Sequence, residues 1–160
     1  MNLFSELEQQ APREFEKHHL QDGEVWIMRN FITTMDATKY FKIFNDTINW
    51  KQEEITFYGK TYPVPRKTAW YGYEGFNYTY SGISCNPNRW TNQLMDIKKD
   101  IESFIPEEDF NSVLLNLYRD GNDKVGWHAD DEKGLGENPI IASVSFGATR
   151  FFDLKHKDNP

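Results

Sequence analysis

The spacing of apolar residues predicts two helices in the first two thirds of the chain. In residues 35–48 the apolar side chains recur with a period of 3.6 residues, and Thr34 is a suitable N-cap. Those side chains are Tyr40, Phe41, Phe44 and Ile48. Residues 91–104 show a clearer pattern, with Thr91 as N-cap and Pro106 just after the end. The apolar positions there are Leu94, Ile97, Ile101 and Phe104.

Alternating or continuous short apolar runs predict strands elsewhere. The predicted strands are 25–32, 52–58, 61–66, 76–81, 111–119, 125–130, 139–146 and 149–155. The pair 52–58 and 61–66 flanks Gly59-Lys60 and is predicted to be a hairpin, with Pro63 and Pro65 making its second arm an edge or irregular strand. Helices followed by short strands indicate an α+β domain, and the run of strands suits a double-stranded β-helix, or jelly roll. A jelly roll needs about eight strands in two sheets, and only the four predicted strands after residue 110 would belong to it, so we expect it to be incomplete at the C-terminus.

Composition is that of one soluble domain. The chain has 160 residues, of which 38% are hydrophobic and 27% charged, and its 16% aromatic content favours a β-rich core. A single cysteine, Cys85, cannot form an internal disulfide, which fits a reducing compartment. We see neither a signal peptide nor an apolar run of the ~20 residues that span a membrane. The expected location is therefore cytoplasmic, with no membrane partner.

The net charge of −7 argues against nucleic-acid binding when it is taken over the whole chain. The charge is unevenly distributed, however. The stretch 51–68 carries four basic residues against two acidic ones: Lys51, Lys60, Arg66 and Lys67 against Glu53 and Glu54. If phosphates are contacted, we expect this stretch to contact them.

His128 and Asp130 are candidates for a metal site. On an extended segment, residues two apart point to the same face, so an imidazole and a carboxylate would converge there. These groups form two thirds of the facial triad that binds Fe(II) and leaves positions open for a co-substrate and O₂. By itself His-x-Asp is a weak signal, because a surface histidine and aspartate beside a turn would have the same spacing.

The surrounding segments strengthen this interpretation. They are PRK at 65–67, YTYSG at 78–82, NLYRDG at 116–121, GWHADDE at 126–132 and IASVSFG at 141–147. Together and in this order they resemble the AlkB family of Fe(II)/2-oxoglutarate-dependent dioxygenases, and most closely its subgroup that acts on duplex DNA. The resemblance covers roughly residues 51–158.

The resemblance implies a set of residue roles. Iron would be bound by His128 and Asp130, and the co-substrate 2-oxoglutarate would be hydrogen-bonded by Asn116 and Tyr118. The residues implied to bind the substrate are Tyr58, Arg66, Tyr78, Asp131 and Glu132. Acidic groups suit an alkylated, cationic base, and an aromatic residue at the hairpin tip would fill the space left by a flipped base. The implied reaction is hydroxylation of an N-alkyl carbon, after which formaldehyde leaves and the DNA base is repaired.

The same resemblance divides the chain, expected to be one domain over 1–160, into three parts. These are an N-terminal extension (1–50), a nucleotide-recognition lid (51–82) and the first part of the jelly-roll core (111–160). The family's second metal-binding histidine and its 2-oxoglutarate-binding arginine are expected beyond Pro160, and His156 matches a position that is not a metal ligand.

Three interpretations of the chain stay open. It is a dealkylating dioxygenase, inactive in this 160-residue form; a non-catalytic nucleic-acid-binding remnant of that family; or a jelly-roll domain with no catalytic role. The paired Asn116/Tyr118 and His128/Asp130 speak against the last. A truncated gene, an incomplete sequence and half of a split protein would each explain the early end. Unpaired sheet edges would then favour self-association.

Overall fold

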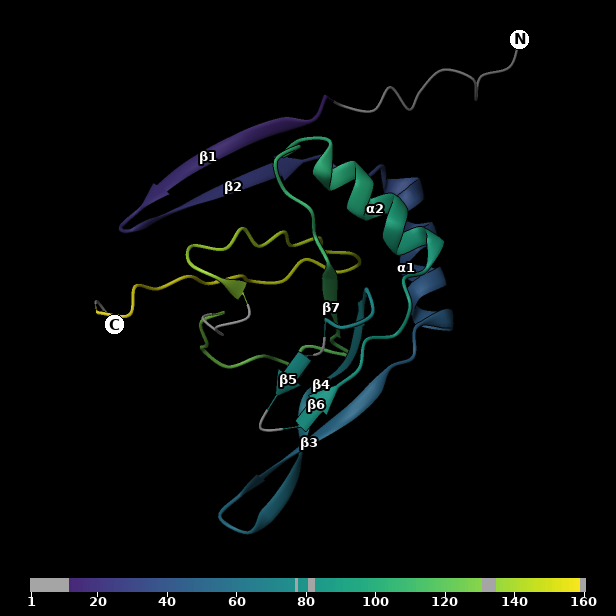
Figure 1. Cartoon of the computed structure of the whole chain (residues 1–160), viewed down its shortest axis with the longest axis vertical. Coiled ribbons are helices and arrows are strands. Elements are labelled where there is room, and N and C mark those ends of the chain that lie inside the picture. The colour runs from purple at the N-terminus through teal and green to yellow at the C-terminus, as the bar shows by residue number, and fades with distance from the viewer. Residues whose placement is uncertain (1–11, 77, 81–82, 131–134, 159–160) are drawn as a thin grey trace. The chain divides into compact units, whose positions relative to one another are not determined.

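The computed structural model describes residues 12–76, 78–80, 83–130 and 135–158, and the chain forms two compact units. The first unit comprises Met1–Asp46 and Ser145–Pro160, and the second comprises Thr47–Val144. Both are mixtures of helix, antiparallel strand and irregular segments (Figure 1). None of the described helices is long and apolar enough to cross a membrane.

The first unit contains an antiparallel hairpin followed by a helix. Strands β1 (Glu14–Leu20) and β2 (Gly23–Arg29) pair along their whole length, and α1 spans Thr34–Thr47. The helix predicted at 35–48 is thus confirmed. The strand predicted at 25–32 is present only as far as Arg29, and the expectation that it is buried is wrong, because its side chains are mainly exposed. The cap was predicted one residue too late, because it is the Thr33 hydroxyl that accepts a 3.0 Å hydrogen bond from the Asp36 amide. Strand β1 was not predicted, since its sequence EFEKHHL is mainly polar.

Aromatic side chains join α1 to the segment that begins at Ser145. The ring of Tyr40 stacks on that of Phe44 with centroids 5.7 Å apart, and Phe146 contacts Phe44 edge-on at 5.8 Å. At Gly147, which has a φ of 87°, a Cβ would lie 3.0 Å from the Phe41 ring. A side chain at this position would therefore strain the backbone and press on the helix.

The second unit is built on a three-stranded antiparallel sheet in the order β3-β4-β7. These strands span Lys51–Phe57, Lys60–Gly72 and Ser112–Leu117. The first part of the long β4 pairs with β3, and its last six residues pair with β7. As a result the β3–β4 hairpin projects beyond the rest of the sheet (Figure 1). The predicted hairpin is confirmed, and Pro63 and Pro65 lie where β3 is the only strand paired with β4.

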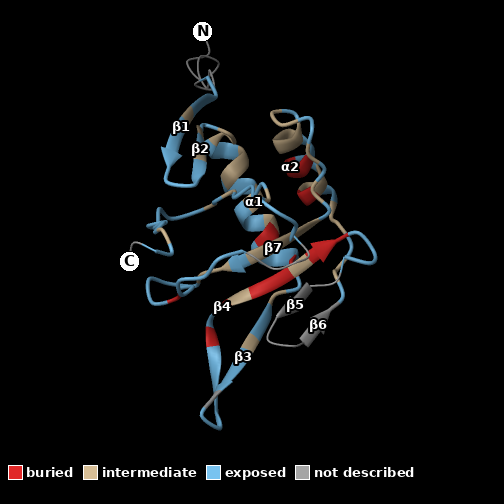
Figure 2. Cartoon of the chain, turned by 60° about the vertical axis from the view of Figure 1, so that its left-hand side comes forward, coloured by how far each residue is buried: buried red, intermediate tan, exposed pale blue. Residues whose placement is uncertain are grey.

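Burial in the second unit is concentrated on β4 and on one face of α2 (Asn92–Glu102), as Figure 2 shows. The buried apolar side chains there are Ile48, Val64, Ala69, Tyr71, Leu94 and Ile97. The predicted N-cap of α2 is confirmed, since the Thr91 hydroxyl accepts a 3.2 Å hydrogen bond from the Leu94 amide. A short antiparallel pair, β5 (Tyr78–Tyr80) and β6 (Ile83–Cys85), lies between β4 and α2 in the sequence.

The strands predicted at 125–130, 139–146 and 149–155 are wrong for this structure, in which these residues are irregular. Alternating apolar residues form a strand only when a neighbouring strand takes up their backbone hydrogen bonds and one face is covered. Here the apolar side chains of the last segment face solvent, with Phe151 97% and Phe152 78% exposed. The two helices and the antiparallel strands that the described residues form give the α+β character that the sequence predicts.

Candidate functional site

His128 and Asp130 approach one another in the irregular segment that follows β7. The His128 Nε2 atom lies 3.7 Å from the Asp130 Oδ1 atom. The other ring nitrogen, Nδ1, is 2.8 Å from the backbone carbonyl of Gly126. A carbonyl can only accept, so Nδ1 carries the proton in this contact and Nε2 is the nitrogen left to bind a metal. Metal-binding histidines are commonly oriented by such a second hydrogen bond.

The imidazole of His128 and the carboxylate of Asp130 fit two of the three positions of the facial triad that binds Fe(II). Two ligands at cis positions of an octahedral ion, each about 2.1 Å from it, lie about 3 Å apart. The observed separation is 3.7 Å, so a closure of about 0.7 Å, within reach of side-chain rotation, would bring both onto one ion. Both side chains are about half exposed, so an ion could reach them from solvent. Within the described ranges, no three His, Cys, Asp or Glu side chains are grouped closely enough to hold a metal.

Asn116 and Tyr118 lie at the end of β7, upstream of the metal motif. Asn116 is opposite Thr68 of β4 and its side chain is exposed, while Tyr118 follows the strand and is partly buried. The turn predicted after them at Asp120-Gly121 is present, with the Asn122 amide donating to the Asp120 carboxylate at 2.8 Å. Convergence of the four polar residues on one cavity stays a prediction.

Tyr58 occupies the tip of the β3–β4 hairpin and is 92% exposed. Phe57 pairs with Lys60, so Tyr58 and Gly59 are the two central residues of a two-residue turn. Both have positive φ, 49° and 74°, as a type I′ turn requires. Glycine adopts this conformation freely, whereas an aromatic residue does so at a cost. An exposed aromatic side chain held in an unfavourable backbone conformation points to a functional role.

The other residues implied to bind substrate are only partly visible. Arg66 lies on β4 and is only 9% exposed, and its buried Nε atom has no hydrogen-bond partner among the residues that the structure describes. The side chain of Tyr78, on β5, and the whole of Asp131 and Glu132 lie outside the described residues. The structure therefore places Tyr58 and Arg66 on one hairpin, and His128 and Asp130 in one pair.

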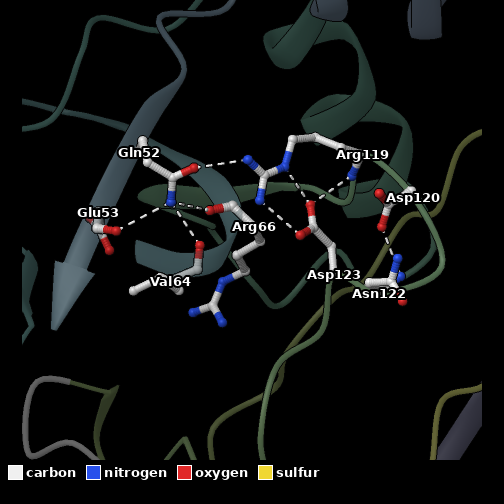
Figure 3. Close-up of polar contacts among 8 residues, drawn as sticks. All are labelled: Gln52, Glu53, Val64, Arg66, Arg119, Asp120, Asn122 and Asp123. Carbon is white, nitrogen blue, oxygen red and sulfur yellow. Dashed lines mark hydrogen bonds and ion pairs between the residues drawn. The ribbon is translucent and has the colours of Figure 1, made fainter. Parts of the chain in front are cut away.

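The sequence did not predict a polar cluster that joins the base of the hairpin to the turn after β7, upstream of His128 in the chain (Figure 3). The buried carboxylate of Asp123 accepts three hydrogen bonds from Arg119: from Nε at 2.7 Å, from Nη2 at 2.8 Å and from the backbone amide at 2.9 Å. The hydrogen bonds to Asp123 raise the pKa of the Arg119 guanidinium. The third nitrogen, Nη1, donates to the Gln52 Oε1 atom at 3.1 Å. We call Gln52, Arg119 and Asp123 the polar clamp.

The polar clamp ends on an irregular part of β4. The register of β3 against β4 shifts between Gln52, which pairs with Lys67, and Glu54, which pairs with Pro63. Such a bulge interrupts the regular ladder of backbone hydrogen bonds. Here the Gln52 side-chain amide donates to the carbonyls of Val64 at 2.7 Å and Arg66 at 3.3 Å. The one signal for this cluster in the sequence is the four-residue spacing of Arg119 and Asp123.

The comparison with known proteins now identifies the chain. Residues 24–160 match the family model of the 2OG-Fe(II) oxygenase superfamily. The chain belongs to this superfamily and, within it, to the AlkB family. It is 42% identical over 139 residues to the human and the bovine alpha-ketoglutarate-dependent dioxygenase alkB homolog 3, a match that covers 86% of this chain and 48% of each relative. It is 45% identical over 105 residues to the human DNA oxidative demethylase ALKBH2, covering 66% of this chain and 40% of that relative.

The AlkB-family chain spans about half the length of the alkB homolog 3 relatives. The matched region includes both residues of the candidate metal pair and the whole β3–β4 hairpin. Membership of the superfamily implies Fe(II) and 2-oxoglutarate as the metal and the co-substrate.

Proposed function

We propose that this protein removes alkyl groups oxidatively from N-alkylated bases in DNA, as an Fe(II)- and 2-oxoglutarate-dependent dioxygenase. The observation that carries the proposal is the His128–Asp130 pair, 3.7 Å apart and oriented through Gly126, in a chain of the AlkB family. Two relatives, one named a dioxygenase and the other a DNA oxidative demethylase, support the same activity.

The roles of the residues follow from their chemistry. His128 Nε2 and Asp130 Oδ1 would hold Fe(II), and Asn116 and Tyr118 would donate hydrogen bonds to 2-oxoglutarate. Fe(II), 2-oxoglutarate and O₂ together supply an oxidant that hydroxylates the N-alkyl carbon, which then leaves as an aldehyde. The protein's own contribution is to orient the co-substrate and the base.

Residues 51–82 would form the lid that recognises the nucleotide. We propose that Tyr58 enters duplex DNA and fills the place of the flipped base, because it is exposed at the projecting tip and presents a face for stacking. Lys51, Lys60 and Lys67 lie on the same hairpin and suit contact with phosphates. Arg66 and Tyr78 would border the base pocket, and Asp131 and Glu132 would favour a cationic base.

The test separates metal chemistry from DNA binding. Because the chain spans about half the length of the alkB homolog 3 relatives, the assay uses the full-length protein with methylated duplex DNA, Fe(II) and 2-oxoglutarate, and formaldehyde is measured. The variants His128→Ala and Asp130→Asn should each lower turnover by about a hundredfold or more, while the affinity for DNA changes little. The control is His19→Ala, which removes an exposed histidine on β1.

Each result has a definite meaning. Loss of formaldehyde production in both variants, with DNA binding retained, supports the dioxygenase. Unchanged turnover in either variant would show that the pair is not the metal site. DNA binding without turnover in the wild-type protein under iron-replete conditions would favour the non-catalytic nucleic-acid-binding alternative.

A further inference from the structure

The polar clamp lies within the second unit and joins two of its segments: the β3–β4 hairpin and the turn after β7. The proposed function requires the hairpin and the segment that follows this turn to act together. One end, Asp123, lies five residues before His128 in the chain. The other end, Gln52, contacts the carbonyls of Val64 and Arg66 at the base of the hairpin that carries Tyr58. A single chain of hydrogen bonds therefore runs from the segment leading to the metal pair to the hairpin leading to the DNA (Figure 3).

The geometry of the clamp is that of a rigid connection. Arg119 uses a forked pair of donors on the two oxygens of Asp123, and this arrangement fixes the guanidinium plane as well as its distance. The Asp123 side chain is 7% exposed, so water competes little for it. A further backbone contact acts in parallel, since the Lys124 amide donates to the Pro65 carbonyl at 2.8 Å. Proline has no amide hydrogen, so Pro65 can take part here only through its carbonyl.

The β-bulge explains why the clamp is needed at this point. A two-stranded ribbon is only marginally stable by itself, and a bulge bends it further. Residues 60–66 of β4, which lead to the hairpin tip, do not pair with β7, whose pairing with β4 begins at Lys67. Without the Gln52 amide, the carbonyls of Val64 and Arg66 would lose these partners, and the projecting hairpin could pivot about the bulge.

We propose that Gln52, Arg119 and Asp123 are positioning residues, which hold the Tyr58 hairpin at a fixed orientation relative to the His128–Asp130 segment. This inference rests on the proposed function. It extends that function by naming the device that aligns the hairpin for duplex substrates, where insertion of Tyr58 and presentation of the base to the metal must happen together. A single-stranded substrate needs no inserted residue and depends less on the alignment.

The decisive variant is Gln52→Met, which keeps the length of the side chain and removes all its hydrogen bonds. In this variant the KM for methylated duplex DNA should rise about tenfold, the change expected when a hydrogen bond to a charged group is lost. The KM for a methylated single strand and the KM for 2-oxoglutarate should change less than about twofold. A general defect in folding would instead impair the reaction equally with the duplex and the single strand, and would alter the KM for 2-oxoglutarate as well. Asp123→Asn should have a similar effect on the duplex, and the double variant should be no worse than the stronger single variant, because the residues act as one unit.

The control Asp120→Asn removes a charge from the same turn while its side-chain oxygen can still accept from Asn122. It should leave the duplex KM unchanged. Amide hydrogen exchange provides a readout that does not depend on activity. In Gln52→Met, the amides of the non-proline residues in 60–66 should exchange about tenfold faster, while those of α2 stay protected.

The outcomes separate the two proposals. Faster hairpin exchange together with a raised duplex KM supports the positioning role. Unchanged exchange and an unchanged duplex KM would overturn it. If exchange rises in the variant but even the wild-type protein shows no dealkylation, the rigid connection stands and the proposed function fails.

Discussion

Lys98 offers a direct test of how burial and charge combine in the second unit. Its side chain is 7% exposed on α2, and its Nζ atom lies 2.6 Å from Glu102 and 2.7 Å from Asp109. The ammonium also lies 5.8 Å from the centre of the Tyr73 ring. Because Glu102 in addition accepts a 2.8 Å hydrogen bond from the Phe110 amide, these contacts join the end of α2 to the segment that leads into β7. The perturbation is Lys98→Met, which keeps the aliphatic stem and removes the charge.

The expected loss of stability depends on how well water can solvate the carboxylates of Glu102 and Asp109 once the Lys98 ammonium is removed. Removing one partner of a fully buried ion pair costs about 3–5 kcal/mol, because the other charge stays buried without compensation. Here Asp109 is 83% exposed and regains water, and only Glu102, 19% exposed, stays largely desolvated. Glu102 also keeps its bond to the Phe110 amide. We therefore expect Lys98→Met to lower the free energy of unfolding by about 2 kcal/mol, or the Tm by about 4–8 °C.

The dependence of this difference on pH has a definite sign. Burial by itself would lower the pKa of Lys98, but the hydrogen bonds and charges of Asp109 and Glu102 outweigh it, so the pKa is raised above its usual value near 10.5. The unfolded chain then loses this proton before the folded one. The stabilisation is complete below about pH 10.5 and declines as the pH rises toward the folded pKa. The difference between wild type and Lys98→Met should therefore shrink above about pH 10.5.

The assay is urea unfolding followed by tryptophan fluorescence, from pH 7 to pH 11.5. The control is Lys42→Met, which removes an exposed ammonium paired with Asp46 on α1 and should change stability too little to resolve. The reasoning is wrong if Lys98→Met is as stable as the wild type at pH 7. It is also wrong if the difference between the two proteins stays constant up to pH 11.5.

Three further predictions concern the helix cap, the hairpin tip and the exposed apolar segment. Thr91→Ala removes the acceptor of the Leu94 amide and should lower stability by about 1 kcal/mol in thermal unfolding, whereas an unchanged Tm would show that another group caps α2. Tyr58→Asn creates the Asn-Gly pair favoured in type I′ turns, so the Tm should hold or rise while repair of duplex DNA falls about tenfold; equal repair would exclude the base-replacing role. Phe151 and Phe152 present exposed apolar surface, so light scattering should show self-association that the double Ser variant reduces; a monomeric wild type would contradict this.

Local sequence determined the elements whose stability is local. The apolar spacing of α1 and α2, the Thr91 cap and the turn before β4 each depend on residues within a few positions, and all are found in the structure. The approach of His128 to Asp130 is also local, because the two residues are two positions apart and His128 contacts the Gly126 carbonyl; a metal at this pair stays a prediction. The order of the short motifs also indicated the family, which the match over residues 24–160 confirms.

Tertiary structure decided what depends on distant partners. The alternation at 139–146 and 149–155 is that of strands, yet a strand forms only where another strand pairs with it, and the local pattern does not contain this information. Likewise, nothing near Lys98 in the sequence shows that its ammonium is buried beside Asp109. The contact of Gln52 with Arg119 joins residues 67 positions apart. It exists because β4 pairs with β3 along one part and with β7 along the other, and so brings the hairpin and the turn after β7 to the same place.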